Sequence, residues 1–121
     1  MKHLEYQIEI DIKPLSVNEA WQGRRFKTDK YRAFQKAVLF YLPKTFEVGT
    51  GKLSVSYEYG FSNKASDIDN PCKLITDILQ KKYKFNDSQI YELHQYKVIV
   101  PKGKEYIKIG INPILRNKES D

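Results

Sequence analysis

Residues 66–77 read SDIDNPCKLITD, and this stretch combines three aspartates, an Asn-Pro pair and a lysine at the start of a helix. Asparagine is a preferred N-cap, and proline suits the first helical position because its missing N–H has no partner there. We therefore expect a helix that begins at Asn70 and runs to the basic last turn at Lys81 and Lys82. Its apolar face consists of Leu74, Ile75, Ile78 and Leu79.

The segments on either side of this stretch predict the rest of the fold. Apolar and polar residues alternate over 5–12 and 52–59, and two further strands are expected at about 90–100 and 105–111. A helix starts at the cap Thr28 and stops before Pro43. Residues 13–27 form a long loop, and the polar tail 113–121 is flexible. The order β-α-β-α-β-β indicates an α+β two-layer sandwich with a four-stranded mixed sheet and two helices.

Length and charge limit the classes of function. The 121 residues fit one domain, 1–121, and the net charge of +6 with a pI of about 9.3 favours a polyanionic partner, nucleic acid first. The longest apolar run, Ala37 to Leu42, is too short to span a membrane. The single cysteine, Cys72, excludes an internal disulfide and favours a reducing compartment, the cytoplasm.

The charges are distributed unevenly. Residues 67–92 hold five acidic and four basic side chains, whereas the rest of the chain holds ten acidic and seventeen basic ones. Asp67 and Asp69 are separated by one residue, so in extended backbone their carboxylates point the same way. Two such carboxylates repel each other unless a cation lies between them. Mg²⁺ suits such a pair. The alternative is a turn with local hydrogen bonds.

Lys73 breaks a local rule. It lies in the first helical turn, where the helix dipole disfavours a cation, and its side chain leans back toward Asp67 and Asp69. Asp77, one turn later on the same face, can orient it. Asp87 follows the helix, just before an expected strand. It joins Asp67 and Asp69 if that strand lies beside the strand that leads to Asp67. The alternatives are a solvated Lys73, a Lys73–Asp77 pair, and an Asp87 that only serves its turn.

Three carboxylates and a lysine in a basic protein favour metal-assisted phosphodiester hydrolysis, with lysine stabilising the developing negative charge. Arg24, Arg25 and Lys27, beside Trp21 and Phe26, are the candidate nucleic-acid contacts of the 13–27 loop. The alternative there is a merely solvated loop.

These residues resemble the RusA-type Holliday-junction resolvases. The resemblance is carried by Asp67-Ile68-Asp69-Asn70 (D-x-D-N), by Lys73 at its offset, and by Asn86-Asp87-Ser88-Gln89-Ile90. Pro14-Leu15-Ser16-Val17-Asn18 resembles the family's P-x-S-x-N segment. The resemblance extends over about 5–112, although Pro71, Cys72 and the loop before the first helix depart from the family pattern.

The resemblance implies a homodimeric, Mg²⁺-dependent endonuclease, with Mn²⁺ as a substitute, that binds four-way junctions and nicks two strands symmetrically. Asp67, Asp69 and Asp87 would ligate the metal, and Lys73 would act in catalysis. Asn18 and Lys64 are further candidate DNA contacts, and Asn70 and Asp77 supporting residues. The resemblance also implies a bacterial, phage or prophage source. The competing functions are a non-catalytic nucleic-acid binder, a metal nuclease for other branched or single-stranded DNA, and a protein–protein adaptor.

Overall fold

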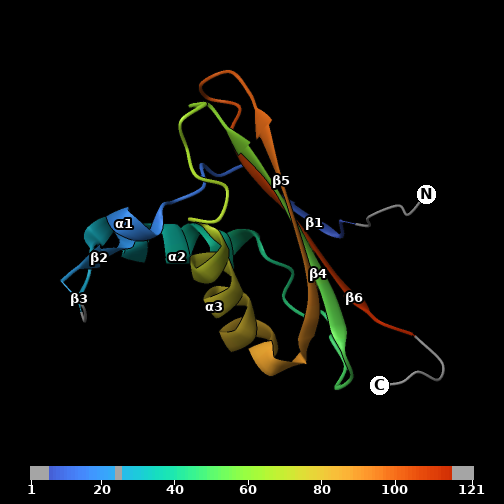
Figure 1. The fold of residues 1–121 in the computed structure, drawn as a ribbon. Helices are drawn as coiled ribbons and strands as arrows, with labels where there is room; N and C mark the ends of the chain where they lie inside the picture. Colours follow the sequence, from blue (N-terminus) through green and yellow to red (C-terminus); the bar gives the residue numbers. More distant parts are fainter. Residues whose placement is uncertain (1–5, 24–25, 116–121) are drawn as a thin grey trace.

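The computed structural model describes residues 6–23 and 26–115 (Figure 1). Its elements are β1 (Ile8–Ile10), α1 (Val17–Ala20), β2 (Trp21–Gln22), β3 (Phe26–Lys27), α2 (Asp29–Tyr41), β4 (Leu53–Phe61), α3 (Cys72–Tyr83), the short 3-10 helix η1 (Asp87–Gln89), β5 (Ile90–Ile99) and β6 (Tyr106–Pro113). The main sheet has the strand order β1-β6-β4-β5. β4 pairs parallel with β5, and the other pairs are antiparallel. The predicted α+β fold with a four-stranded mixed sheet is therefore confirmed.

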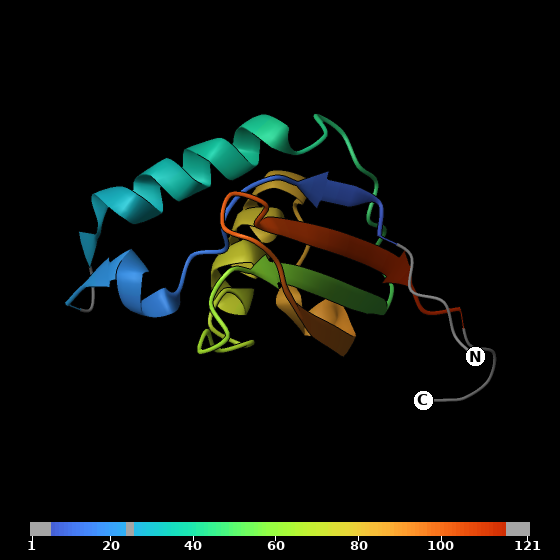
Figure 2. The same ribbon diagram turned by 90° about the horizontal axis from the view of Figure 1, so that it is seen from above.

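The core lies between this sheet and the helices α2 and α3, which cover one of its faces (Figures 1 and 2). Alternate side chains of the two central strands point into it, as the period-two pattern predicts. They are Leu53, Val55, Tyr57, Tyr59 and Phe61 from β4, and Ile107, Ile109 and Ile111 from β6. The helices contribute Tyr31, Phe34, Val38, Leu74, Ile75, Ile78 and Leu79. None of the helices in the described part of the chain is long and apolar enough to cross a membrane.

The expected loop 13–27 contains more structure than its composition indicates. Ser16 and Glu19 form a capping box that starts α1, with the Asn18 amide donating to Ser16 Oγ at 3.0 Å. β2 and β3 then form a two-stranded hairpin. The hairpin is held to α2 because Trp21 packs edge-on against Tyr31, with 5.3 Å between ring centroids. The prediction of a plain loop was therefore wrong, although S-x-x-E was visible in the sequence.

Two element boundaries also differ from expectation. The strand expected over 5–12 is only three residues long, because the chain bends where the Ile12 amide donates to the Ile10 carbonyl. The expected tail 113–121 begins too early, because Pro113 still belongs to β6 and the Ile114 amide donates to the Lys52 carbonyl at 2.9 Å. The remainder of that tail, 116–121, and residue 5 of the expected strand lie outside the described residues.

The β4–α3–β5 unit decides where the polar segments lie. Parallel strands cannot be joined by a tight turn, so the chain must return along the sheet before β5 starts. α3 makes this return. The loop 62–71 consequently lies at the end of β4, and η1 lies at the opposite end of α3, where β5 begins (Figure 1).

Gly60 marks a close approach on the sheet face opposite the helices. A Cβ at this position would lie 2.5 Å from two carbon atoms of the Tyr106 ring. The ring cannot easily move away, because the Tyr106 hydroxyl donates to Glu58 Oε2 at 2.5 Å. Only glycine fits beneath this ring without displacing it.

We expect Gly60→Ala to lower the free energy of unfolding by about 1–3 kcal/mol, the usual cost of adding a methyl group to a filled site. Urea denaturation monitored by circular dichroism measures the change. The matched control is Gly51→Ala, because no heavy atom lies within 4 Å of a Cβ built there and its φ is not positive. Equal midpoints for the two variants would contradict the steric argument.

Candidate functional site: the acidic loop at the start of α3

The loop 62–71 is shaped by its own short polar side chains. The Ala65 amide donates to Asn63 Oδ1 at 2.9 Å, and the Ser66 amide donates to the Asn63 carbonyl at 3.1 Å. The Asn70 amide donates to the Asp67 carbonyl at 3.4 Å, so residues 67–70 form a turn. Asp67 and Asp69 are both exposed in this turn. The expectation that they lie in extended backbone was wrong; they are gathered by a tight turn instead.

The start of α3 also differs from the prediction. Pro71 rather than Asn70 occupies the N-cap position, and no side chain caps this end of the helix. The Pro71 carbonyl accepts the first intrahelical bond, from Ile75, at 3.1 Å. The cap moves by one residue because the turn 67–70 uses Asn70 as its last member. The first helical amide groups therefore have no side-chain acceptor of their own, which favours an anion near this terminus.

Cys72 connects the turn with the core. Burial raises the pKa of its thiol, the hydrogen bond to Thr76 lowers it, and the Asp69 carboxylate adds to the rise while the Lys73 ammonium opposes it. Asp69 likewise contributes to the raised pKa of Tyr59, whose main cause is burial. Asp69 thus lies on the side of the turn near Cys72, and Lys73 is exposed in the following helical turn. A half-buried thiol with a raised pKa serves packing rather than nucleophilic attack.

Lys97, on β5, brings a second cation to the loop. Its Nζ donates to the carbonyl oxygens of Lys64 at 2.7 Å and Ser66 at 2.5 Å, and lies 5.8 Å from the centre of the Phe61 ring. The ammonium thereby fastens the loop to the sheet directly before Asp67. The sequence analysis missed this residue, because the contact spans more than thirty positions and Lys97 stands in an ordinary strand pattern.

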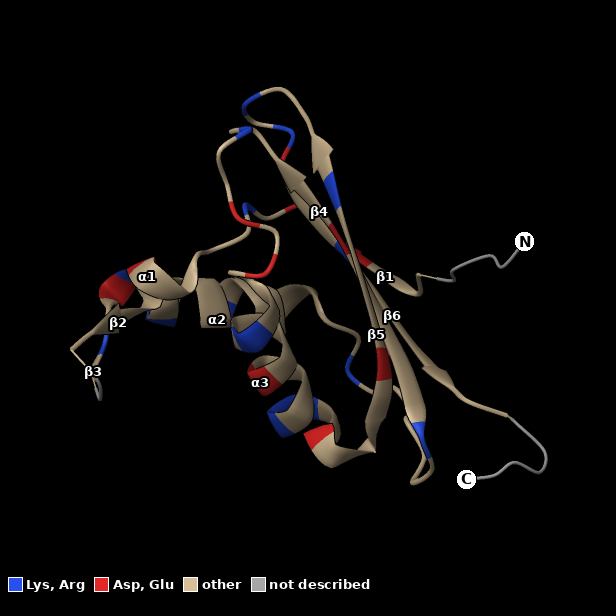
Figure 3. Cartoon of the chain, in the orientation of Figure 1, with Lys and Arg blue, Asp and Glu red and all other residues tan. Residues whose placement is uncertain are grey.

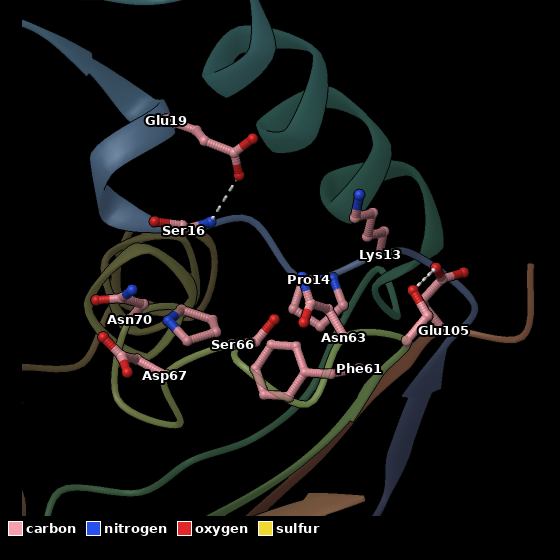
Figure 4. Close-up of a pocket in the computed structure, with 12 residues that line it drawn as sticks. Lys13, Pro14, Ser16, Glu19, Phe61, Asn63, Ser66, Asp67, Asn70 and Glu105 are labelled. Atoms are coloured by element: carbon pink, nitrogen blue, oxygen red, sulfur yellow. Dashed lines mark hydrogen bonds between the residues drawn. The ribbon is translucent and has the colours of Figure 1, made fainter. Parts of the chain in front are cut away.

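A pocket of about 240 Å³ lies between this loop and the segment that precedes α1. Asp67 and Asn70 are at one end of it, and Lys13 and Glu105 at the other, with Pro14 between (Figure 4). The fold thus places Pro14 and Ser16 of the expected P-x-S-x-N segment beside residues 67–70, the acidic turn. Asn18 itself is exposed on α1.

Asp87 lies at the opposite end of α3 from Asp67 and Asp69. It is the first residue of η1, where Asn86 caps the backbone and Gln89 donates to the carbonyl oxygens of Gly49 and Gly51. The twelve residues of α3, about 18 Å at 1.5 Å per residue, separate it from the turn 67–70. Figure 3 shows acidic positions at the two ends of this helix. Within the described residues of one chain, no three acidic, histidine or cysteine side chains are grouped as a metal site.

A family model for the endodeoxyribonuclease RusA matches residues 12–110 of the 121. The chain belongs to the RusA endodeoxyribonuclease family. The search of curated proteins returned no match. The matched range includes the acidic turn, Lys73, Lys97 and Asp87. The resemblance drawn from the D-x-D-N and N-D-x-Q motifs is therefore confirmed at the level of the RusA family.

The remaining candidate residues of this RusA-family chain are spread over its surface. Lys27 donates to Gln35 Oε1 at 3.4 Å, and the side chain of neighbouring Phe26 is 71% exposed. Lys64 is exposed in the acidic loop. Arg24 and Arg25 lie outside the described residues.

Asp77 is half-buried in the second turn of α3. Its charge contributes to the raised pKa values of Tyr31 and Tyr57, both of which are dominated by burial. Among the described side chains, no ion pair or hydrogen bond joins Asp77 to Lys73. Its role in orienting Lys73 remains a prediction.

Lys97→Met keeps the aliphatic chain but removes both hydrogen bonds to the loop. We expect amide hydrogen exchange to quicken by up to about tenfold across 62–71, because a hydrogen bond from a charged group contributes about 1.5 kcal/mol. Mass spectrometry of peptic fragments measures this. Lys102→Met, in the exposed turn between β5 and β6, is the control. Unchanged exchange in the Lys97 variant would show that the loop holds its shape without the tether.

Proposed function

We propose that this protein is a Mg²⁺-dependent endonuclease that resolves four-way DNA junctions by paired, symmetric nicks. The observation that carries the proposal is the exposed carboxylate pair of Asp67 and Asp69, gathered in one turn at the start of α3 in a RusA-family chain. Carboxylates that only stabilise a turn need no cation beside them. Here the Lys73 and Lys97 side chains accompany the pair, and the chain as a whole is basic.

The donor set of the turn fits magnesium. Mg²⁺ binds through one or two carboxylates and keeps several of its waters, and Mn²⁺ accepts the same oxygen ligands. Asp67 and Asp69 would hold the ion from the acidic turn. A bound ion of this kind polarises a phosphodiester and lowers the pKa of the attacking water.

The protein's own groups supply binding and charge. Lys73 is exposed in the first turn of α3 and can donate to a phosphate oxygen as negative charge develops there. In this proposal Lys64 and Lys27 contact the DNA backbone, where lysine contributes affinity without reading the bases. Asn70, at the end of the turn, lines the pocket beside Asp67 and supports its position. A four-way junction needs two equivalent cuts, so we include a two-fold homodimer in the proposal.

Asp69→Asn removes one negative ligand while preserving the shape of the side chain. We expect nicking of a synthetic four-way junction with Mg²⁺ to fall at least about a hundredfold, as losing a metal ligand costs several kcal/mol of transition-state stabilisation. Gel-shift affinity for the junction without metal should be unchanged or slightly higher.

The control for this experiment is Asp11→Asn, an exposed carboxylate after β1, which should nick like the wild type. A wild-type protein that binds the junction but cuts nothing with Mg²⁺ or Mn²⁺ would be a non-catalytic binder. Comparison of junction, flap, linear duplex and single strand distinguishes a resolvase from a nuclease with another substrate.

Lys64→Ala tests the proposed backbone contact. Each phosphate contact adds close to one unit to the slope of log affinity against log salt. We therefore expect junction binding to weaken and this slope to shrink by about one, equally for junctions of different sequence. Fluorescence anisotropy at several salt concentrations measures both. Lys44→Ala, an exposed lysine after α2, serves as control, and identical slopes for the two variants would remove Lys64 from the interface.

A further inference from the structure

The pocket between the loop 62–71 and the start of α1 extends well beyond the carboxylate pair. Asp67 lies at one end of it, and the rest of its lining comes from the loop, the end of β4, the chain at the start of α1 and the turn before β6 (Figure 4). Its volume of about 240 Å³ lies just below the range of about 300–1,000 Å³ that is usual for drug-sized ligands. The pocket therefore suits one small ring system.

The inner wall of the pocket is apolar and rigid. Three of its lining residues, Pro14, Phe61 and Pro71, are buried. The Phe61 ring is held from two other sides, with its centre 5.8 Å from that of the Tyr59 ring and 5.8 Å from Lys97 Nζ. Flat apolar side chains of this kind accept the face of another ring. The wall therefore favours a planar, apolar surface.

The rim of the pocket is polar and carries more negative than positive charge. It holds the carboxylates of Glu19, Asp67 and Glu105 and a single ammonium, that of Lys13. A phosphate group would be repelled by this excess of two negative charges, although the chain as a whole is basic. The pocket is therefore suited to a group without negative charge.

The rim offers both an acceptor and a donor. Glu105 accepts from Ser62 Oγ at 2.7 Å and from the Gly103 amide at 2.9 Å, and the bond from Ser62 is the main reason why the pKa of this carboxyl is lowered. Each carboxylate oxygen can accept a further bond. Asn63 Oδ1 accepts from the Ala65 amide, and within the described part of the chain its Nδ2 has no acceptor. A ligand edge with its own donors and acceptors can bind here.

A nucleobase combines these properties. Its faces are flat and apolar, it has no negative charge, and its edge presents hydrogen-bond donors and acceptors. Proteins that take a base out of its stack hold it in this way, between apolar side chains and with hydrogen bonds to its edge. The strands of a four-way junction exchange partners at its centre, so bases there can lose the continuous stacking of a duplex.

We propose that this pocket binds one unstacked base of the DNA substrate, from a nucleotide next to the cleaved phosphate, and that Asn63 and Glu105 contact the edge of that base. This inference rests on the proposed nuclease function. Asp67 belongs both to the carboxylate pair and to the pocket lining, so the phosphate and the base come from neighbouring positions of one strand. Cutting then depends on which base stands at that position, because base contacts specify sequence whereas phosphate contacts do not.

A cycle between protein and DNA variants tests the contact. Glu105→Gln keeps the shape of the side chain but removes its charge, and single bases are omitted in turn around the branch point of a synthetic junction. We expect Glu105→Gln to weaken metal-free binding of the intact junction about fivefold, the difference between hydrogen bonds to charged and neutral groups. This loss should vanish on the one junction that lacks the bound base. Fluorescence anisotropy measures both affinities.

The matched control is Glu47→Gln, an exposed carboxylate after α2 that does not line the pocket. It should bind every junction as the wild type does. An effect of Glu105→Gln that is the same on all junctions would overturn the base contact.

A second measurement needs no cleavage. The fluorescent base 2-aminopurine brightens when it leaves its stack, so it is placed at each position around the branch point in turn. With the wild type and no metal, we expect brightening at the position found in the cycle. Ser66→Leu adds bulk to the pocket lining and should abolish it, whereas Ser88→Leu, exposed at the other end of α3, should not.

The outcomes separate the pocket from the nuclease. A wild type that nicks junctions without brightening any position, or brightening that persists in Ser66→Leu, would overturn the base pocket and leave the proposed function standing. A wild type that binds junctions and cuts nothing would overturn the proposed function. The fluorescence measurement would then still decide whether the pocket holds a base.

Discussion

The parallel pairing of β4 with β5 dictates how the neighbouring elements are arranged. A parallel pair obliges the chain to cross from one end of the sheet to the other, and α3 does so while burying Leu74, Ile75, Ile78 and Leu79 in the core. Apolar side chains thereby occupy the middle of the unit, and polar turns are left at both of its ends. One turn carries Asp67 and Asp69, and the other carries Asp87. The architecture that buries the core is thus also what divides the acids.

The acidic turn is a small polar assembly on a rigid frame. Its carboxylates stay exposed, so placing two of them together does not carry the cost of burying charge. Local hydrogen bonds accepted by Asn63 and Asp67 shape the loop, and Lys97 ties it to the strand beside β4. Sites formed by loops on a fixed scaffold are the usual place for chemistry in proteins. Here Lys97 of β5 holds the loop just before Asp67, Lys73 follows the loop in the first turn of α3, and the chain as a whole has a net charge of +6.

Residues whose behaviour depends on near neighbours were predicted well. The alternation in β4, the cap at Thr28, the helical spacing of the α3 face and the family motifs all rest on positions a few residues apart. The misses have two causes. The Pro, Gly and polar residues of 13–27 predict a loop, whereas the capping box of Ser16 and Glu19, a local signal, starts α1 ahead of the hairpin. The turn at 67–70 was read as extended backbone because the competing bond from the Asn70 amide has no mark in the sequence other than residue types common to many loops.

Periodicity, capping and motif spacing are properties of neighbouring side chains, so they were enough to predict the four strands of the main sheet, the helices α2 and α3 and the RusA family, and to propose candidate site residues. Which of those residues meet depends on how whole elements pack together. Strand order and direction place Lys97 against the loop and keep Asp87 a helix length away from Asp67 and Asp69. Order and direction follow from how whole elements bury their apolar faces together, a balance over the entire core that no single stretch of sequence contains.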